Sequence, residues 1–174
     1  MPDTRDRHPL RLVRLEPVHE RNLAQDSDYK VAMAGNDWGL LARVMQRVIG
    51  NDVRSTPTVE SAHPEWGGYL AIDDTTNELI GSCAFKAPPT PDGVTEIAYF
   101  TYPGFEGRGY ATLMARRLLE LATTSPTVRR IIAHTLPERN ASTRVLEKVG
   151  MHFVGEVMDP DDGRVWRWEV QVGA

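Results

Sequence analysis

The segment of residues 94–124 constrains the fold more than any other stretch, because it changes from a strand pattern to a helix pattern. Residues 94–101 are rich in β-branched and aromatic side chains, which favours a strand. Pro103 and Gly104 interrupt that pattern, since proline fixes φ and glycine tolerates the backbone angles of a tight turn. Apolar residues then recur at helical spacing, at Leu113, Met114, Leu118, Leu121 and Ala122. The segment therefore predicts a strand, a tight loop and a helix in succession.

The loop itself contains small residues just before the predicted helix. Gly107, Gly109 and Ala111 leave the helix start with little side-chain bulk. Backbone N–H groups are unpaired at a helix start and lie at the positive end of the helix dipole, so they suit an anion such as a pyrophosphate. Arg108 adds a charged donor. Glycine spacing alone is equally compatible with a helix that packs closely on a strand, so both interpretations stay open here.

The remaining chain predicts a mixed arrangement of strands and helices. A helix is expected to start at Asn36-Asp37 and run to Ile49, where Gly50-Asn51 ends it, and a connecting loop is expected over 51–67. The other predicted strands are 10–15, 68–73, 78–85, 129–135, 152–158 and 165–172, and the other predicted helices are 18–25 and 140–149. This order indicates an α/β protein with a mixed, mostly antiparallel central sheet and helices on both faces.

A second informative segment follows the strand 129–135. It runs from Ser142 through Val-Leu-Glu-Lys at 145–148 to Gly150 and Met151. Val145, Leu146 and Val149 have the spacing of core positions, with charged residues between them. By itself this predicts only a short amphipathic helix that ends at a glycine.

Taken together, the two segments resemble the GCN5-related N-acetyltransferase (GNAT) superfamily. The loop resembles its motif A, Gln/Arg-x-x-Gly-x-Gly/Ala: Gly109 and Ala111 match the last two positions, and Glu106 stands where Gln or Arg is usual. The second segment is most similar to the branch of bacterial ribosomal-protein N-terminal acetyltransferases, with Met151 in place of the usual Phe. The resemblance implies an acyl-CoA N-acyltransferase fold, acetyl-CoA as co-substrate and an amine as acceptor, either a protein N-terminus or a small molecule.

The resemblance also implies where acetyl-CoA would bind. Its thioester arm would lie along the end of the strand, and the backbone N–H of Phe100 is the candidate that polarises the carbonyl. Asn140 is a further candidate ligand at the start of the second helix. The full set of cofactor candidates is Tyr99, Phe100, Thr101, Gly107, Arg108, Gly109, Tyr110, Ala111, Thr112 and Asn140.

Two residues compete for the role of general base, because the attacking amine must be neutral. Glu96 lies within the central strand, and His134 lies near the end of the next one, where an imidazole ordinarily changes charge near neutral pH. Each is also compatible with a structural hydrogen bond, and a water relay or no dedicated base is a further alternative. Many family members carry a proton-donating Tyr where this chain has Leu146, so that role does not carry over. In the branch that the chain resembles, the Ser at the position of Ser142 can hydrogen-bond the leaving thiolate, and the resemblance therefore implies Ser142 as the candidate donor. Helix capping is the alternative role for Ser142.

Composition narrows the remaining possibilities. A chain of 174 residues with a net charge of −4 is expected to form a flexible stretch over residues 1–8 and a single domain over 9–174, without affinity for nucleic acid. The single Cys83 excludes an intramolecular disulfide, and the five histidines show no zinc spacing, so no metal is expected. The lack of a long apolar run predicts no membrane span, and the N-terminus lacks the apolar core of a signal peptide, so a cytoplasmic protein is the default expectation. The protein is expected to be a monomer or a homodimer.

Two alternative functions remain open, and so does the acceptor. One is a module that binds acyl-CoA without turnover. The other is a dehydrogenase-type nucleotide-binding domain, which the sequence disfavours because Thr112 stands at the position of the third glycine. The acceptor is expected to contact residues 30–66, whose chemistry the sequence does not reveal.

Overall fold

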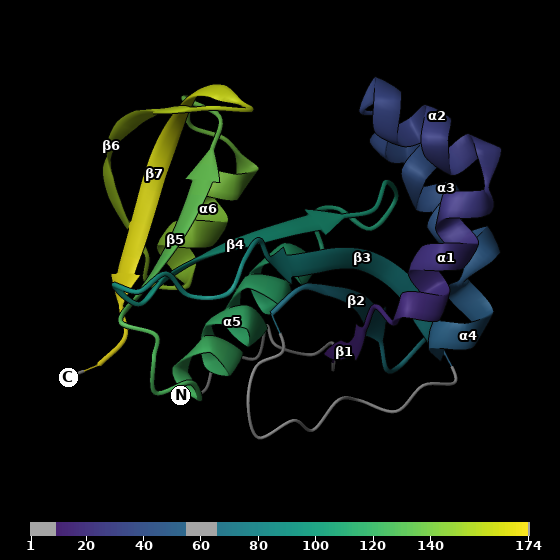
Figure 1. The fold of residues 1–174 in the computed structure, drawn as a ribbon, viewed down its shortest axis with the longest axis horizontal. Helices are drawn as coiled ribbons and strands as arrows, with labels where there is room; N and C mark the ends of the chain where they lie inside the picture. The colour runs from purple at the N-terminus through teal and green to yellow at the C-terminus, as the bar shows by residue number, and fades with distance from the viewer. Residues whose placement is uncertain (1–9, 55–65, 174) are drawn as a thin grey trace. The chain divides into compact units, whose positions relative to one another are not determined.

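The computed structural model describes residues 10–54 and 66–173. The predicted flexible stretch at 1–8 lies outside the described residues. Along the chain the elements are β1 (Leu10–Arg14), α1 (Pro17–Gln25), α2 (Ser27–Gly35), α3 (Trp38–Val48), α4 (Gly50–Arg54), β2 (Gly68–Asp73), β3 (Glu78–Phe85), β4 (Val94–Thr101), α5 (Tyr110–Thr123), β5 (Arg130–Thr135), α6 (Ala141–Lys148), β6 (His152–Asp159) and β7 (Gly163–Gln171) (Figure 1).

The strands hydrogen-bond in the order β1-β2-β3-β4-β5-β7-β6. The pairs β1–β2, β5–β7 and β6–β7 are antiparallel, and β4–β5 is parallel. This mixed, mostly antiparallel sheet with its helices confirms the predicted fold class. None of the helices that the structure describes is long and apolar enough to cross a membrane.

The chain forms two compact units, and both β3 and β4 contribute residues to each of them. The first unit holds described residues 10–54, 68–82 and 100–110, and the second holds 66–67, 83–99 and 111–173. The single domain over 9–174 stays a prediction.

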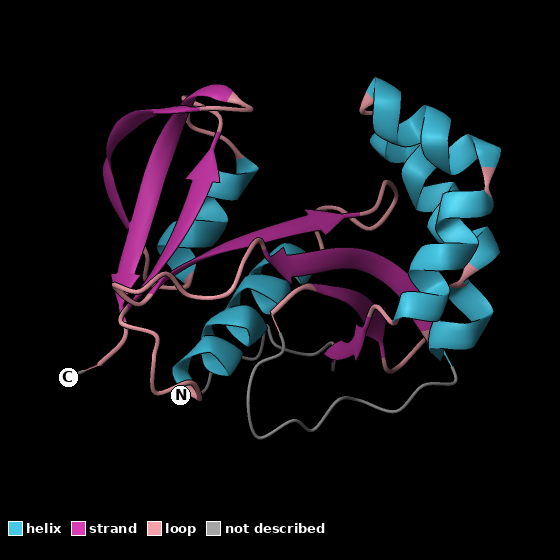
Figure 2. Ribbon diagram, in the orientation of Figure 1, coloured by secondary structure: helices cyan, strands magenta, loops and turns pink. Residues whose placement is uncertain are grey.

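The first unit packs the helices α1–α4, visible as one group in Figure 2, around a core that includes the hairpin β2–β3. Asp37 caps α3 as the sequence predicts, because its carboxylate accepts a hydrogen bond from the Leu40 N–H at 2.9 Å. The fully buried core side chains of this unit include Val13, Leu23, Val44, Ile49, Val53, Leu70, Ile72, Leu79 and Tyr102.

Two helices of this unit were missed by the sequence patterns. The predicted end of the earlier helix is confirmed, because α3 ends at Val48 with Ile49 as its C-cap, but the predicted loop is wrong over 51–54, where the chain forms the separate helix α4. Val53 is fully buried there and its N–H donates to the Ile49 carbonyl at 3.0 Å, so core packing extends the helical path. α2 shows no helical apolar period, since Ala32 is its one buried residue, but Asp26 caps it by accepting from the N–H groups of Asp28 and Tyr29.

A buried carboxylate in the first unit binds the start of α5. The Tyr110 hydroxyl donates to Asp73 Oδ2 at 2.5 Å, and Asp73 Oδ1 accepts from the N–H groups of Thr75 and Thr76. Asp73 is fully buried, so these bonds replace the water that an exposed carboxylate would have. Burial, followed by the bond to Asp73, raises the pKa of Tyr110 to about 12.

We expect Tyr110→Phe to lower the free energy of unfolding by about 1–3 kcal/mol at neutral pH, because it removes a donor from a buried carboxylate. The ordinary tyrosine pKa is near 10 and the folded value is near 12. A raised folded pKa means that the stabilisation is complete below pH 10 and is lost as pH rises toward 12. Urea titrations of the wild type and of Tyr110→Phe at pH 8 and pH 11 measure the free energy of unfolding. The difference in this free energy between the two proteins should be smaller at pH 11 than at pH 8, and an unchanged difference would contradict the assignment.

In the second unit, β5 lies between β4 and β7. The antiparallel register with β7 covers all of β5, from Arg130 opposite Gln171 to Thr135 opposite Trp166 (Figure 1). Among the described residues, the register with β4 covers only Val94–Glu96 against residues 130–132. Both strands continue beyond these pairs. In the described register, the last residues of β4 and β5 are therefore not paired with each other.

The last strand, β7, carries two tryptophans, Trp166 and Trp168. Phe153 of β6 lies 5.0 Å from the Trp166 ring and 5.6 Å from the Trp168 ring, measured between centroids. Trp168 is buried, and its Nε1 donates to the Thr135 hydroxyl at 3.1 Å. These contacts use the rings for packing within the second unit.

Candidate active site

A cavity of about 300 Å³ lies in the second unit, where β4 and β5 cease to pair. Its lining comes from the two strands, the residue after β3, the start of α6 and the β6–β7 turn. The lining residues are Lys86, Glu96, Ile97, Ala98, Tyr99, Ala133, His134, Thr135, Leu136, Ser142, Asp162 and Val165. All three residues predicted to be catalytic, Glu96, His134 and Ser142, therefore contribute to one cavity.

The two residues that compete for the role of base are bonded to each other. His134 Nδ1 lies 3.0 Å from Glu96 Oε1. The register explains the contact: Glu96 lies opposite Ile132, and His134 follows two residues later on the same face of the parallel strand. The Glu96 side chain is 19% exposed and the His134 side chain is 12% exposed, so the hydrogen bond between them is largely shielded from water. An imidazole oriented by a carboxylate is an arrangement that can accept and release a proton.

A third residue, Lys86, was not predicted from the sequence. Lys86 Nζ lies 2.6 Å from Glu96 Oε1, and the Lys86 backbone N–H donates to the Glu96 carbonyl at 2.9 Å. Burial lowers the pKa of Lys86, but the bond to Glu96 and the charges of Asp162 and Asp159 outweigh it, so the pKa is raised. The only signal in the sequence was its position directly after a strand, and its partner depends on the pairing of β3 with β4.

The start of α6 places Ser142 at the cavity without using it as a cap. Asn140 caps the helix: its Oδ1 accepts from the Thr143 N–H at 3.0 Å, and the Thr143 hydroxyl lies 3.1 Å from the Asn140 N–H. The predicted alternative that Ser142 caps α6 is therefore wrong. The Tyr99 hydroxyl donates to the Ser142 carbonyl at 3.3 Å, and burial raises the pKa of Tyr99.

The remaining candidates at the end of β4 differ in what their side chains do. The half-buried Phe100 ring lies 5.2 Å from the Trp38 ring, measured between centroids, and packs against the first unit's core. The Thr101 hydroxyl is buried and has no hydrogen-bond partner among the described residues.

The glycine loop has the open backbone that anion binding needs. Gly107 and Gly109 have φ of 76° and 87°, and a Cβ built on either would meet no heavy atom within 4 Å. The Glu106 carboxylate accepts from the Gly104 N–H at 2.8 Å, which gives this departure from the motif a role within the loop. The Arg108 guanidinium lies 5.6 Å from the centre of the Phe105 ring. Space beside the backbone amides is therefore available to phosphate oxygens.

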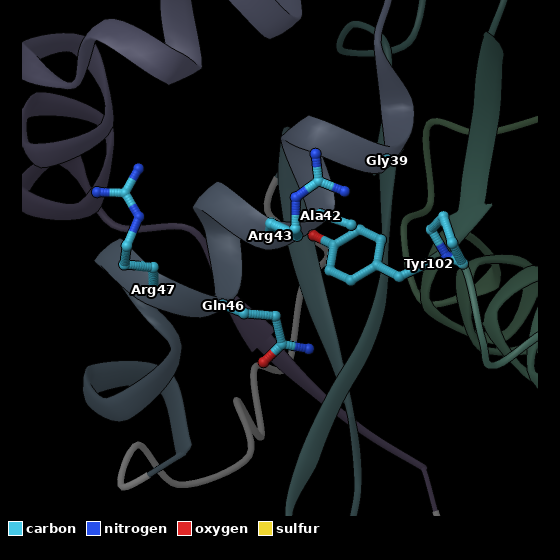
Figure 3. A pocket seen from close by; sticks show the side chains of 7 residues that line it. Gly39, Ala42, Arg43, Gln46, Arg47 and Tyr102 are labelled. Atoms are coloured by element: carbon cyan, nitrogen blue, oxygen red, sulfur yellow. The ribbon is translucent and has the colours of Figure 1, made fainter.

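A second cavity, of about 480 Å³, lies in the first unit beside α3. It is lined by Gly39, Ala42, Arg43, Gln46, Arg47, Tyr102 and Pro103 (Figure 3). Arg47 points away from the Tyr102 ring and pairs with Asp26 and Asp28 at 3.0 and 3.1 Å. The helix residues lie within the region expected to contact the acceptor, and that assignment stays a prediction.

Neither a covalent carrier nor a metal cluster is found among the described residues. Cys83 is buried, and burial raises its pKa well above the usual range, so its thiol is not a ready nucleophile. No group of three or more His, Cys, Asp or Glu side chains in the described ranges is placed to hold a metal ion.

Comparison with known proteins identifies the family. The family model described as "Acetyltransferase (GNAT) domain" matches residues 10–152. The chain belongs to this family of acyltransferase enzymes. Among curated proteins it is similar to the uncharacterized N-acetyltransferase YjdG of Bacillus subtilis (strain 168), with 28% identity over 82 residues that cover 47% of this chain and 49% of YjdG. The chain spans about half the length of the curated relatives it matches.

Solved structures share the fold at lower identity. The aminoglycoside acetyltransferase AAC(6')-Ib in complex with coenzyme A aligns with a TM-score of 0.62 and 20% identity, over 94% of this chain and 95% of that one. RimL, the ribosomal L7/L12 alpha-N-protein acetyltransferase in complex with coenzyme A, aligns with a TM-score of 0.53 and 19% identity, over 60% and 61%. The ribosomal-protein branch is thus one of several structural neighbours, and membership of that branch stays a prediction.

Proposed function

We propose that this chain transfers an acetyl group from acetyl-CoA directly to a primary amine, in a complex that holds both substrates. The observation that carries the proposal is the hydrogen-bonded pair of Glu96 and His134 in a cavity that also contains Ser142. Membership of the GNAT family supports the reaction class, and the coenzyme A complexes of AAC(6')-Ib and RimL support the co-substrate.

The residues of the chain fit what the reaction requires. When bound, acetyl-CoA supplies a thioester whose acyl carbon forms a bond to the amine nitrogen as its bond to sulfur breaks. The nitrogen loses a proton, which the pair of His134 and Glu96 accepts. The sulfur leaves as a thiolate that needs a donor, and the Ser142 hydroxyl is the candidate. The burial of Cys83 supports direct transfer over an acyl-cysteine intermediate.

The cofactor would be held by backbone groups. The open space beside Gly107 and Gly109 fits a pyrophosphate approached by N–H groups, with Arg108 as a charged neighbour. The acceptor is either a protein N-terminus or a small-molecule amine.

Turnover with a mixed amine panel tests the proposal. Release of free CoA thiol would be followed with N-terminal peptides, aminoglycosides and polyamines, and each product would be identified by its acetyl mass shift. Tight CoA binding without turnover on any amine would favour the alternative, an acyl-CoA-binding module without catalysis. A melting temperature raised by NAD but not by CoA would favour a dehydrogenase-type domain.

We expect Gly109→Ala to weaken CoA binding by about tenfold or more, because the new methyl group enters the space beside the loop amides and the loss of a charge-assisted hydrogen bond has about this effect. Isothermal titration with CoA measures the affinity. Gly150→Ala is the matched control, since Gly150 has φ of 88° and equally open surroundings after α6. Equal affinities in the two variants would contradict a pyrophosphate site at the loop.

A further inference from the structure

We propose that Lys86 is a positioning residue that fixes the roles of the two catalytic candidates. Lys86 keeps Glu96 as a hydrogen-bond acceptor, so that His134 presents its Nε2 atom as the general base. The inference rests on the proposed function and deepens it, because it decides between the two competing residues. Glu96 becomes the group that orients the imidazole, and His134 becomes the group that takes the proton.

The geometry places both nitrogen atoms on one oxygen. Glu96 Oε1 lies 2.6 Å from Lys86 Nζ and 3.0 Å from His134 Nδ1. The three residues belong to neighbouring segments: Lys86 follows β3, Glu96 is in β4 and His134 is in β5. An ammonium group in direct contact favours the ionised carboxylate, and an ionised carboxylate can only accept hydrogen bonds.

The tautomer of His134 follows from this. Since Glu96 accepts, His134 Nδ1 must carry the hydrogen atom, and in a neutral imidazole the lone pair is then on Nε2. His134 Nε2 is buried and has no hydrogen-bond partner among the described residues, and His134 lines the cavity. Nε2 is therefore the nitrogen whose lone pair is unused. Because it is buried in this structure, the incoming amine or a bridging water must reach it from the cavity that His134 lines.

The charges around His134 determine the effect of removing Lys86. The negative groups near His134 are the carboxylate of Glu96 and those of the β6–β7 turn, where Asp159 and Asp162 lie near Lys86 and His134. On β7, Arg167 lies opposite His134 and is paired with Glu169. Lys86 is thus the cation that balances the carboxylate bonded to the imidazole. Without it, the surrounding carboxylates favour the imidazolium form, which cannot act as a base.

The test compares Lys86→Met with Lys86→Arg, which keeps the positive charge. We expect the acidic limb of the pH profile of kcat/KM to move up by about half a pH unit or more in Lys86→Met and to stay within about 0.2 unit of wild type in Lys86→Arg. A merely structural role for Lys86 would lower activity at every pH without moving this limb. An unmoved limb in Lys86→Met overturns the proposal.

A measurement without turnover separates this inference from the proposed function. Nitrogen-15 NMR of histidine-labelled protein reports the imidazole tautomer, and His134→Gln identifies the His134 signal by its loss. We expect the Nδ1–H tautomer in wild type and a titration midpoint of that signal that rises in Lys86→Met. An Nε2–H tautomer overturns the inference even in an active enzyme, whereas the expected tautomer in a protein without turnover upholds the geometry and overturns only the acetyl transfer.

Discussion

We expect His134→Gln to lower kcat/KM at neutral pH by about 100-fold or more, because glutamine can keep a hydrogen bond to Glu96 but cannot accept a proton. His134 and Glu96 share one hydrogen bond in the cavity, and both side chains are largely shielded from water. Steady-state kinetics with saturating acetyl-CoA measure the loss, and the melting temperature confirms that the fold is kept.

His152→Gln is the matched control for this variant. His152 begins β6, is exposed and does not line the cavity, so its replacement should leave kcat/KM within about twofold of wild type. A His134→Gln enzyme with near wild-type kcat/KM from pH 6 to pH 9 would remove His134 from the proton transfer and leave a water relay as the explanation.

Gly93→Ala lowers the free energy of unfolding by about 3 kcal/mol, since it combines backbone strain with overpacking. Gly93 has φ of 78°, and a Cβ there would lie 2.6 Å from both the Thr127 carbonyl oxygen and Arg129 Cγ. The Gly93 carbonyl also accepts from the N–H groups of Arg129 and Arg130 at 2.7 and 3.1 Å, so the backbone cannot shift freely.

Gly150→Ala separates the two contributions to this loss. It has a similar left-handed φ of 88° but open space around the added methyl group, so it should cost only about 1 kcal/mol. Urea denaturation of both variants measures the difference. Equal losses would show that the contact with Thr127 and Arg129 is relieved at no cost.

Much of the fold could be predicted because local patterns and tertiary packing agree. Residues 94–101 are rich in β-branched and aromatic side chains and form β4, and the capping residue Asp37 starts α3 as expected. The predictions failed where packing outweighs local preference. Part of the predicted loop forms the short helix α4, whose Val53 enters the core, and α2 depends on the cap at Asp26 rather than on a periodic apolar face.

The candidate site was predictable only in part. Glu96, His134 and Ser142 were found from their positions on the expected strands and helix, and the structure brings them to one cavity. Their relation was not predictable, because the bond between Glu96 and His134 depends on the register of β4 with β5. Lys86 lies outside the two segments that the sequence singles out and becomes a partner only through the pairing of β3 with β4.

The cap of α6 has a consequence for how this site can change during evolution. Asn140 and Thr143 bond to each other's backbone, so the folding of this helix does not depend on the hydroxyl between them. Selection can therefore change the residue at position 142 without destabilising α6. A descendant enzyme could carry another side chain there, suited to a different acyl donor or leaving group, on the same helix.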